Sequence, residues 1–117
     1  MSEHAFDVEI AGDTAVVRAS GELDLSTAPA LERAIQEPLH VDAVRTIMLD
    51  LRHLRFIDST GLRLVLATDS RLRTEGLRLQ VIKGPVSVHR VFELALLEER
   101  LEFVDGGGAF GGGTGSA

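Results

Sequence analysis

Hydrophobic and polar residues alternate near the start of the chain and predict a β-hairpin. Phe6, Val8 and Ile10 are separated by acidic residues, a period of two that is typical of a strand with one face in solvent. A Gly-Asp pair at residues 12–13 is suited to a turn, and a second run of strand-forming residues follows it. We therefore expect a hairpin over residues 5 to 20, with its first strand at the edge of a sheet.

The next segment changes to helical spacing. Leucine and isoleucine recur about one helical turn apart after Pro29, a residue that the first turn of a helix tolerates. Ser26 or Thr27 is suited to cap the start of this helix. The pattern predicts a helix over about residues 27 to 38.

The rest of the chain alternates apolar runs with helical stripes. The run "TIMLDL" at 46–51 lacks a clean alternation, which favours an inner strand covered on both faces. After a short connection through Phe56 and Ile57, a helical stripe extends to Gly76, a residue suited to end a helix. The remaining expected elements are a strand at 77–82, a helix from Gly84 to near Glu99, and a last strand within "RLEFV".

This order of elements predicts an α/β protein. It calls for a mixed, mostly parallel sheet that is entered by the N-terminal hairpin and has helices packed on it. A chain of 117 residues has the size of one domain, which we place at residues 1–105. Residues 106–117 are mostly glycine and cannot offset their ordering entropy, so we expect them to form a flexible tail.

Composition and charge exclude several functions. The formal net charge of −6 opposes attraction to a phosphate backbone, so we expect no direct nucleic-acid binding. The chain has no cysteine for a disulfide or a thiolate metal site. It also has no secretory signal pattern and no apolar stretch near the roughly 20 residues of a membrane helix. We expect a cytoplasmic protein with no membrane attachment and no cofactor.

The segment "FIDSTG" at residues 56–61 concentrates the candidate chemistry. An α/β-hydrolase elbow would need glycine where Ile57 stands, and an aspartic-protease loop would need a second copy of the motif. A phosphate-binding loop pattern is also missing. The histidines lack the paired spacing of metal ligands, so we expect no metal site and a surface position for all four, which are His4, His40, His53 and His89.

Ser59 has two possible roles on this evidence. It precedes a helical stripe and is suited to cap that helix by accepting a hydrogen bond from a free amide. The same helix terminus carries a partial positive charge, so it would also tolerate a phosphate on the serine. Asp58 would oppose the added charge of about −1.5 to −2, which would make the modified state electrostatically tense. A structural cap and a regulatory modification site both remain open.

Three segments taken together resemble a known family. They are "GELDLSTAPAL" at 21–31, "LDLRHLRFIDSTGLRLVL" at 49–66 and "LQVIKGPVSVHRVFEL" at 79–94. In this order they resemble the bacterial anti-sigma factor antagonists, stand-alone members of the STAS family of sulfate transporters and anti-sigma factor antagonists. The resemblance covers about residues 5 to 105 and implies a STAS-like fold and a regulatory protein that is not an enzyme.

The resemblance also implies a site and its partners. Ser59 would be phosphorylated by an anti-sigma factor that is itself a serine kinase, and a metal-dependent serine phosphatase would remove the phosphate. The unmodified form would bind the anti-sigma factor and free a sigma factor. The implied partner-binding residues are Asp24, Asp58, Ser59, Thr60 and Gly61. The oligomeric state stays open.

Neighbouring charges and alternative functions complete the expectations. Asp50 is expected to make a structural hydrogen bond to a loop amide. Arg52, Arg55 and Arg63 would either neutralise a phosphoserine or line a surface for an acidic partner. One alternative is a STAS scaffold subunit of a lipid-transport ATPase complex or a stress-sensing assembly. Another is a small hydrolase with Ser59 as nucleophile, which would need a base brought in by the fold.

Overall fold

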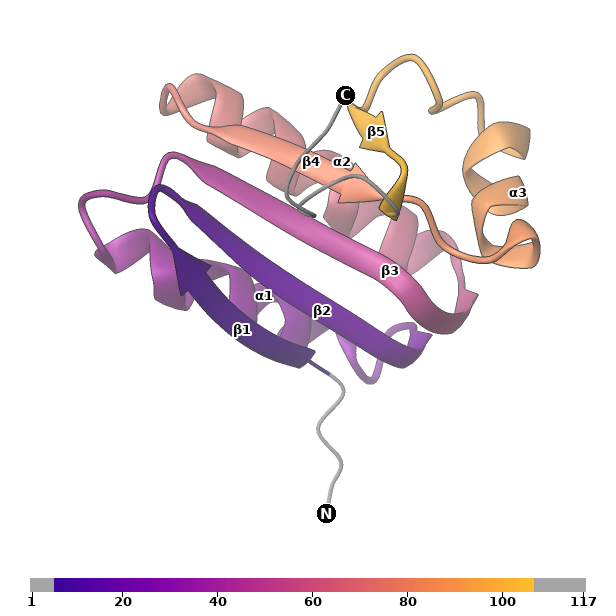
Figure 1. Cartoon of the computed structure of the whole chain (residues 1–117). Coiled ribbons are helices and arrows are strands. Elements are labelled where there is room, and N and C mark those ends of the chain that lie inside the picture. Colours follow the sequence, from indigo (N-terminus) through magenta and orange to yellow (C-terminus); the bar gives the residue numbers. More distant parts are fainter. Residues whose placement is uncertain (1–5, 107–117) are drawn as a thin grey trace.

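The computed structural model describes residues 6–106, which form one sheet with helices packed against it (Figure 1). The elements in chain order are β1 (Phe6–Ala11), β2 (Thr14–Leu23), α1 (Ala28–Gln36), the 3-10 helix η1 (Glu37–His40), β3 (Thr46–Ile57), α2 (Ser59–Thr74), β4 (Arg78–Ile82), α3 (Val86–Leu94) and β5 (Phe103–Val104). The expected flexible tail lies outside the described residues, apart from Gly106.

The strands follow one another across the sheet in the order β1-β2-β3-β4-β5. β1 is antiparallel to β2 and forms the edge, whereas the pairs β2–β3, β3–β4 and β4–β5 are parallel. A helix connects each parallel pair, as a crossover between parallel strands requires. The predicted α/β class, with a hairpin leading into a mostly parallel sheet, is confirmed.

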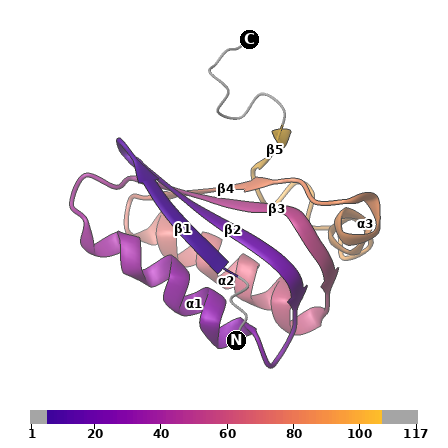
Figure 2. The ribbon, with the colours of Figure 1, turned by 60° about the horizontal axis from the view of Figure 1, so that its bottom comes forward.

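The helices cover the sheet unequally (Figure 2). α1 and α2 lie side by side against one face, and α3 lies where the long strand β3 comes to its end. Between the sheet and the helices lies a core of aliphatic side chains around Phe92, which is fully buried. A second, smaller cluster on the sheet consists of Val16, Met48 and Ile82, with Val104 packed against it.

β3 is longer than its sequence pattern predicted. The expected strand stops at residue 51, but the strand continues to Ile57. Leu54 and Ile57 are buried, and they pair in register with Gly21 and Leu23 of β2. The extension is irregular, because the register shifts twice along this part of β2. Such irregularities break the alternation of apolar residues, which explains why the segment did not resemble a strand.

α3 is shorter than predicted. The expected helix continued to near Glu99, but it ends at Leu94. Leu96 has a left-handed backbone conformation with φ 61°, and the amide of Leu97 donates to the carbonyl of Phe92 at 3.0 Å. Glycine usually occupies this left-handed position at the end of a helix. Because leucine stands there instead, the sequence carries no signal that α3 ends at Leu94.

Candidate functional site

Two loops meet at the end of the sheet because β2 and β3 run parallel. The last paired residues of these strands are Leu23 and Ile57. Asp24 and Asp58 follow them directly, and the amide of Asp58 donates to the carbonyl of Leu23 at 3.2 Å. The fold therefore brings the "GELD" and "FIDSTG" segments together, although more than thirty residues separate them in the chain. We call this region the β2–β3 loop site, made of residues 24–27 and 58–61.

Asp58, and not Ser59, caps α2. Its extended backbone places it just before the helix, and its carboxylate accepts a hydrogen bond from the amide of Gly61 at 3.1 Å. Ser59 is the first residue of the helix, so the expected serine cap is wrong. A carboxylate is the better cap here because its charge also interacts favourably with the positive end of the helix dipole.

The Ser59 hydroxyl is consequently accessible. Its side chain is exposed and makes no hydrogen bond to any residue of the described chain. Thr60, the next residue, is half-buried. Within residues 6–106 the backbone amides of Ser59 and Thr60 have no hydrogen-bond acceptor, because the Asp58 carboxylate binds the amide of Gly61. The serine oxygen thus stands at a helix terminus with free donors nearby.

Gly61 is buried and sets the spacing of the site. A Cβ atom at this position would lie 2.8 Å from side-chain carbons of Leu23 and Ile57, and 3.0 Å from the Leu23 carbonyl oxygen. These contacts are too short for a side chain, so only glycine lets the first turn of α2 approach the end of β2. The residue lies in the site as expected, but its contacts are within the chain.

Asp24 organises the neighbouring loop. One carboxylate oxygen accepts hydrogen bonds from the Ser26 hydroxyl at 2.7 Å, the Ser26 amide at 3.0 Å and the Thr27 amide at 3.2 Å. The hydrogen bond from the Ser26 hydroxyl, together with the two amide bonds, holds the pKa of Asp24 below its usual range. Asp24 therefore stabilises the turn that leads from β2 into α1.

Thr27 occupies the cap position of α1 without capping it through its side chain. Its hydroxyl instead donates to the carbonyl of Glu22 at 2.9 Å. The hydroxyl also accepts from the amide of Asp24 at 3.0 Å, so it bridges the end of β2 and the loop. Thr27 therefore stands at the predicted cap position of α1. The predicted hydrogen bond from its side chain to the helix is absent, because the hydroxyl binds Glu22 and Asp24 instead.

Asp50 lies within β3 and not beside a loop. Its carboxylate accepts from the amide of Arg52 at 3.0 Å and from both sides of the Arg52 guanidinium, at 3.0 Å and 2.8 Å. Burial raises the pKa of Asp50, but these hydrogen bonds and the charge of Arg52 outweigh it and hold the pKa below its usual range. The expected structural role is correct, although the amide belongs to a strand.

The three arginines near the motif differ in their availability. The guanidinium of Arg52 is held by Asp50. Arg55 and Arg63 are exposed and form no ion pair with another described residue. Arg63 lies four residues after Ser59 on α2, the spacing at which two side chains share one face of a helix. Arg63 is therefore placed to respond to a charge on Ser59.

Sequence reasoning did not assign a role to two exposed apolar side chains, one within the β2–β3 loop site and one beside it. Leu25 is 74% exposed directly after Asp24, and Phe56 is 48% exposed two residues before Asp58. Both side chains add exposed apolar area at this end of the sheet. Phe56 was assigned to a connection, and only its strand position shows that the side chain is not needed in the core.

The described histidines supply no base in hydrogen-bond contact with Ser59. His40 and His53 are exposed as expected, whereas His4 lies outside the described residues. His89 is buried, which corrects the expected surface position, and its hydrogen-bond partner is Glu98. No histidine within residues 6–106 hydrogen-bonds to Ser59, so the described part of the chain does not show the imidazole base that the hydrolase alternative needs.

Comparison with known families agrees with this fold. A sequence model of the family described as "Mlab, STAS domain" matches residues 6–105. The chain is a member of the STAS domain family. Among related sequences, an "Anti-sigma-B factor antagonist" of Staphylococcus aureus (strain NCTC 8325 / PS 47) is 31% identical over 90 residues, which cover 77% of this STAS domain chain and 82% of the relative.

Some solved structures of similar fold are described as anti-sigma factor antagonists. An anti-sigma factor antagonist from Mycobacterium paratuberculosis superposes with a TM-score of 0.73 at 31% identity, covering 84% of this chain and 82% of the other. The anti-sigma factor antagonist SpoIIAA in its unphosphorylated form gives 0.72 at 28% identity over 88% and 90% of the two chains. Its phosphorylated form, from Bacillus, gives 0.66 at 27% identity over 88% and 94%.

Among the described residues, no helix of this STAS domain has both the length and the apolar character needed to cross a bilayer.

Proposed function

We propose that this STAS domain is an anti-sigma factor antagonist and that phosphorylation of Ser59 controls its binding to an anti-sigma factor. The observation that carries the proposal is the exposed, unbonded Ser59 hydroxyl at the start of α2, in a segment whose local structure Asp58 and Gly61 maintain without it. Similarity to proteins named anti-sigma factor antagonists supports the binding function. A similar protein, SpoIIAA, is known in a phosphorylated form.

The binding surface in this proposal is the exposed part of the β2–β3 loop site. Asp24, Asp58, Ser59 and Thr60 provide its polar centre. Leu25 and Phe56 provide apolar area beside it, which drives association because partner contact removes it from water. Gly61 contributes from inside, since its packing sets the distance between the two loops. The unmodified surface binds the anti-sigma factor, which then releases its sigma factor.

Phosphorylation would change the charge of this surface. The partner kinase transfers the γ-phosphoryl group of ATP to the Ser59 oxygen, and the hydroxyl proton is removed by a base of the kinase. Asp58 lies beside this oxygen, and one oxygen of its carboxylate accepts the hydrogen bond that caps α2. The new group adds about −1.5 to −2 charge beside Asp58, which repels an acidic or closely fitted partner surface. A metal-dependent serine phosphatase restores the hydroxyl by hydrolysis.

Arg63 and the helix terminus limit the cost of the modified state. A phosphate on Ser59 would lie near the free amides of the first turn and one helical turn from Arg63. Both interactions favour the charge and oppose the repulsion from Asp58. The modified protein therefore stays folded, and the change is confined to binding.

Phosphorylation site mapping tests the proposal. The protein would be incubated with ATP and the kinase recovered with it from its native host, and peptides would be analysed by mass spectrometry. We expect phosphate on Ser59, none on the Ser59→Ala variant, and unchanged modification of Thr60→Ala. Absence of phosphate, or phosphate on Thr60 in the native sequence, would remove the basis of the switch.

The alternative of a scaffold subunit in a lipid-transport ATPase complex or stress-sensing assembly predicts another partner. The names of the similar proteins favour the antagonist. Affinity capture from the native host separates the two, because a sigma-factor regulator and a transport ATPase differ in size and sequence. Capture of a transport ATPase that is insensitive to Ser59→Asp would support the scaffold instead.

A further inference from the structure

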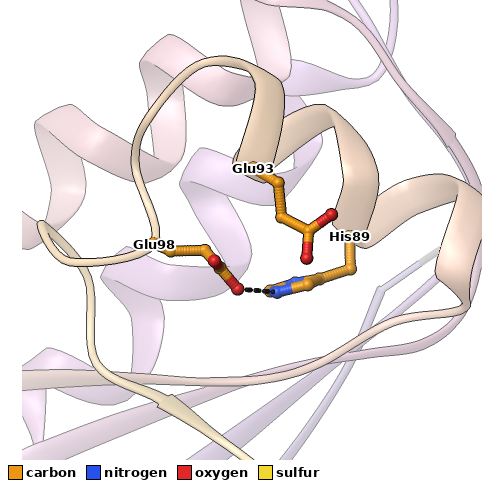
Figure 3. Close-up of side chains that lie close together, drawn as sticks. All are labelled: His89, Glu93 and Glu98. Carbon is orange, nitrogen blue, oxygen red and sulfur yellow. Dashed lines mark hydrogen bonds and ion pairs between the residues drawn. The ribbon is translucent and has the colours of Figure 1, made fainter.

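A second group of chemically active side chains lies on α3 and the segment after it (Figure 3). It consists of His89, Glu93 and Glu98, none of which belongs to the β2–β3 loop site. His89 and Glu93 are one helical turn apart on α3, and Glu98 reaches back toward them. The His89 Nε2 atom lies 2.8 Å from a carboxylate oxygen of Glu98, and one donor atom from each residue lies within 4.8 Å of the others.

The imidazole of His89 is held firmly in place. The residue is only 9% exposed. Its ring packs edge-on against Phe103, with ring centres 4.8 Å apart and planes at 88°, and also contacts Phe92 at 6.2 Å. These aromatic contacts fix the ring so that Nε2 is directed at Glu98. An oriented nitrogen is the part of a metal site that is hardest to assemble from exposed side chains.

The backbone after α3 places Glu98 opposite the ring. Leu96 adopts φ 61°, and the amides of Leu96 and Leu97 donate to the carbonyls of Glu93 and Phe92, both at 3.0 Å. This closed turn reverses the chain within a few residues of the helix end. Glu98 consequently faces the same side of α3 as His89 and Glu93.

We propose that His89, Glu93 and Glu98 bind one divalent transition-metal ion, with zinc as the preferred ion. Imidazole nitrogen and carboxylate oxygen are both zinc ligands, and three such donors leave a fourth position for water. Bonds of about 2.0 to 2.2 Å in a tetrahedral site put donor atoms roughly 3.4 Å apart. The distance from Nε2 of His89 to Glu98 is 2.8 Å, shorter than this value, and all three donor atoms lie within 4.8 Å of one another. Rotation of the exposed Glu93 and Glu98 side chains can bring the donor atoms to the separation of a tetrahedral site while the buried His89 ring stays in place.

Charge balance favours the ion as well. Two carboxylates near one another repel, and a divalent cation between them neutralises both. Bound metal would also tie the segment after α3 to the helix, since His89 and Glu98 come from opposite sides of the turn at Leu96. The expected role is a clamp on this end of the domain, with no contribution to the loop at Ser59.

The other ring nitrogen of His89, Nδ1, affects the expected affinity for zinc. Nδ1 of His89 is buried and has no hydrogen-bond partner among the described residues. When Nε2 binds a metal, the ring proton must be on Nδ1, where it finds no acceptor. Metal-bound histidines usually donate this proton to a carbonyl or carboxylate, and loss of such a partner typically weakens metal affinity by about 10- to 100-fold. We therefore expect a moderate affinity compared with a structural zinc site.

Zinc titration of the full chain tests the site. Zinc chloride would be added to metal-free protein in an isothermal titration calorimeter, and melting would be followed with and without zinc. We expect one ion per chain and a higher melting temperature with zinc. Glu93→Gln and Glu98→Gln should each raise the Kd by about tenfold or more, whereas Glu99→Gln, an exposed neighbour in the same segment, should leave it unchanged.

NMR of the His89 imidazole shows whether zinc binds at this histidine or at another one. Nitrogen chemical shifts of His89, followed by NMR as zinc is added, should change at the same zinc concentration in the native protein and in Glu99→Gln, but only at about tenfold higher zinc or more in Glu98→Gln. The proposal is overturned if zinc does not bind, or if it binds equally to the Glu93→Gln and Glu98→Gln variants. Binding that shifts only His40 or His53 would equally overturn it. These outcomes leave the proposal for Ser59 unaffected.

Discussion

The carboxylate of Asp58 accepts a hydrogen bond from the amide of Gly61 at 3.1 Å. This bond places the cap of α2 one residue before Ser59 and leaves the serine hydroxyl exposed. The acidic residue of the motif thus has a structural role that does not require the serine.

Removing the Asp58 carboxylate should destabilise the domain. We expect Asp58→Ala to lower the free energy of unfolding by about 1 kcal/mol, the usual cost of a lost helix cap. Asp58→Asn keeps a side-chain oxygen and should lose only a few tenths of a kcal/mol. Urea unfolding followed by circular dichroism measures both, with Ser59→Ala as the control that should be neutral. Equal stability of Asp58→Ala and the native protein would contradict the assigned cap.

Gly61→Ala should be more damaging than its size suggests. The added methyl group would lie 2.8 Å from carbons of Leu23 and Ile57, so α2 or β2 must shift. We expect a loss of about 1 to 3 kcal/mol in the free energy of unfolding, as in other overpacked cores. The exposed α2 residue Ser70 gives a matched control, since Ser70→Ala should change stability by less than about 0.5 kcal/mol. A tolerated alanine at residue 61 would show that the spacing is adjustable.

Asp50 should make the free energy of unfolding depend on pH in the acidic range. Its pKa is held below the usual value in the folded protein, so its contribution is present above the unfolded pKa of about 3.9. That contribution is lost as the pH falls through the lower folded pKa. Asp50→Asn should therefore flatten the fall in stability below about pH 4.

The same variant has an effect at neutral pH. Asp50 is buried, but its partner Arg52 is 40% exposed at its side chain and can be hydrated when the ion pair is lost. We expect Asp50→Asn to lower the free energy of unfolding by about 1 to 3 kcal/mol. Arg18→Gln, which breaks the exposed pair with Glu9, is the control and should cost less than about 1 kcal/mol. An equal loss in both variants would speak against a special role for Asp50.

Replacing Leu96 by glycine should stabilise the domain. Its left-handed backbone is unfavourable for any residue with a side chain, and the residue is 83% exposed, so little packing is lost. We expect Leu96→Gly to raise the free energy of unfolding by about 0.5 kcal/mol after the entropy of glycine is counted. Leu94→Gly, at the last residue of α3 and 76% exposed, should instead lower it by up to about 1 kcal/mol. Similar losses at both positions would contradict the strain at Leu96.

The sequence could predict the element order because periodicity survives wherever one face of an element is buried. The hairpin, the parallel sheet and the position of α2 follow from that signal. Periodicity did not predict the ends of elements where the local backbone geometry is irregular. Two register shifts broke the alternation that would have extended β3 to Ile57, and Leu96 occupied a position where glycine would have marked the end of α3.

The candidate site was predictable only in part, for the same reason. Adjacent ends of parallel strands explain why Asp24 and Asp58 meet, but a linear pattern does not say which of two neighbouring polar residues caps the helix. Ser59 and Asp58 are both good caps by type, and only the backbone geometry decides between them. His89 and Glu93 had helical spacing, yet Glu98 joins them only because α3 ends early.

Binding of Ser59 variants to the anti-sigma factor tests the central claim most directly. The partner would be purified after capture from the native host, and its Kd would be measured for the native protein, Ser59→Ala and Ser59→Asp, with Thr60→Ala as control. The account predicts that Ser59→Ala binds like the native protein and keeps its partner when ATP is added, while Ser59→Asp binds at least about tenfold more weakly. Equal affinity of Ser59→Ala and Ser59→Asp would contradict it.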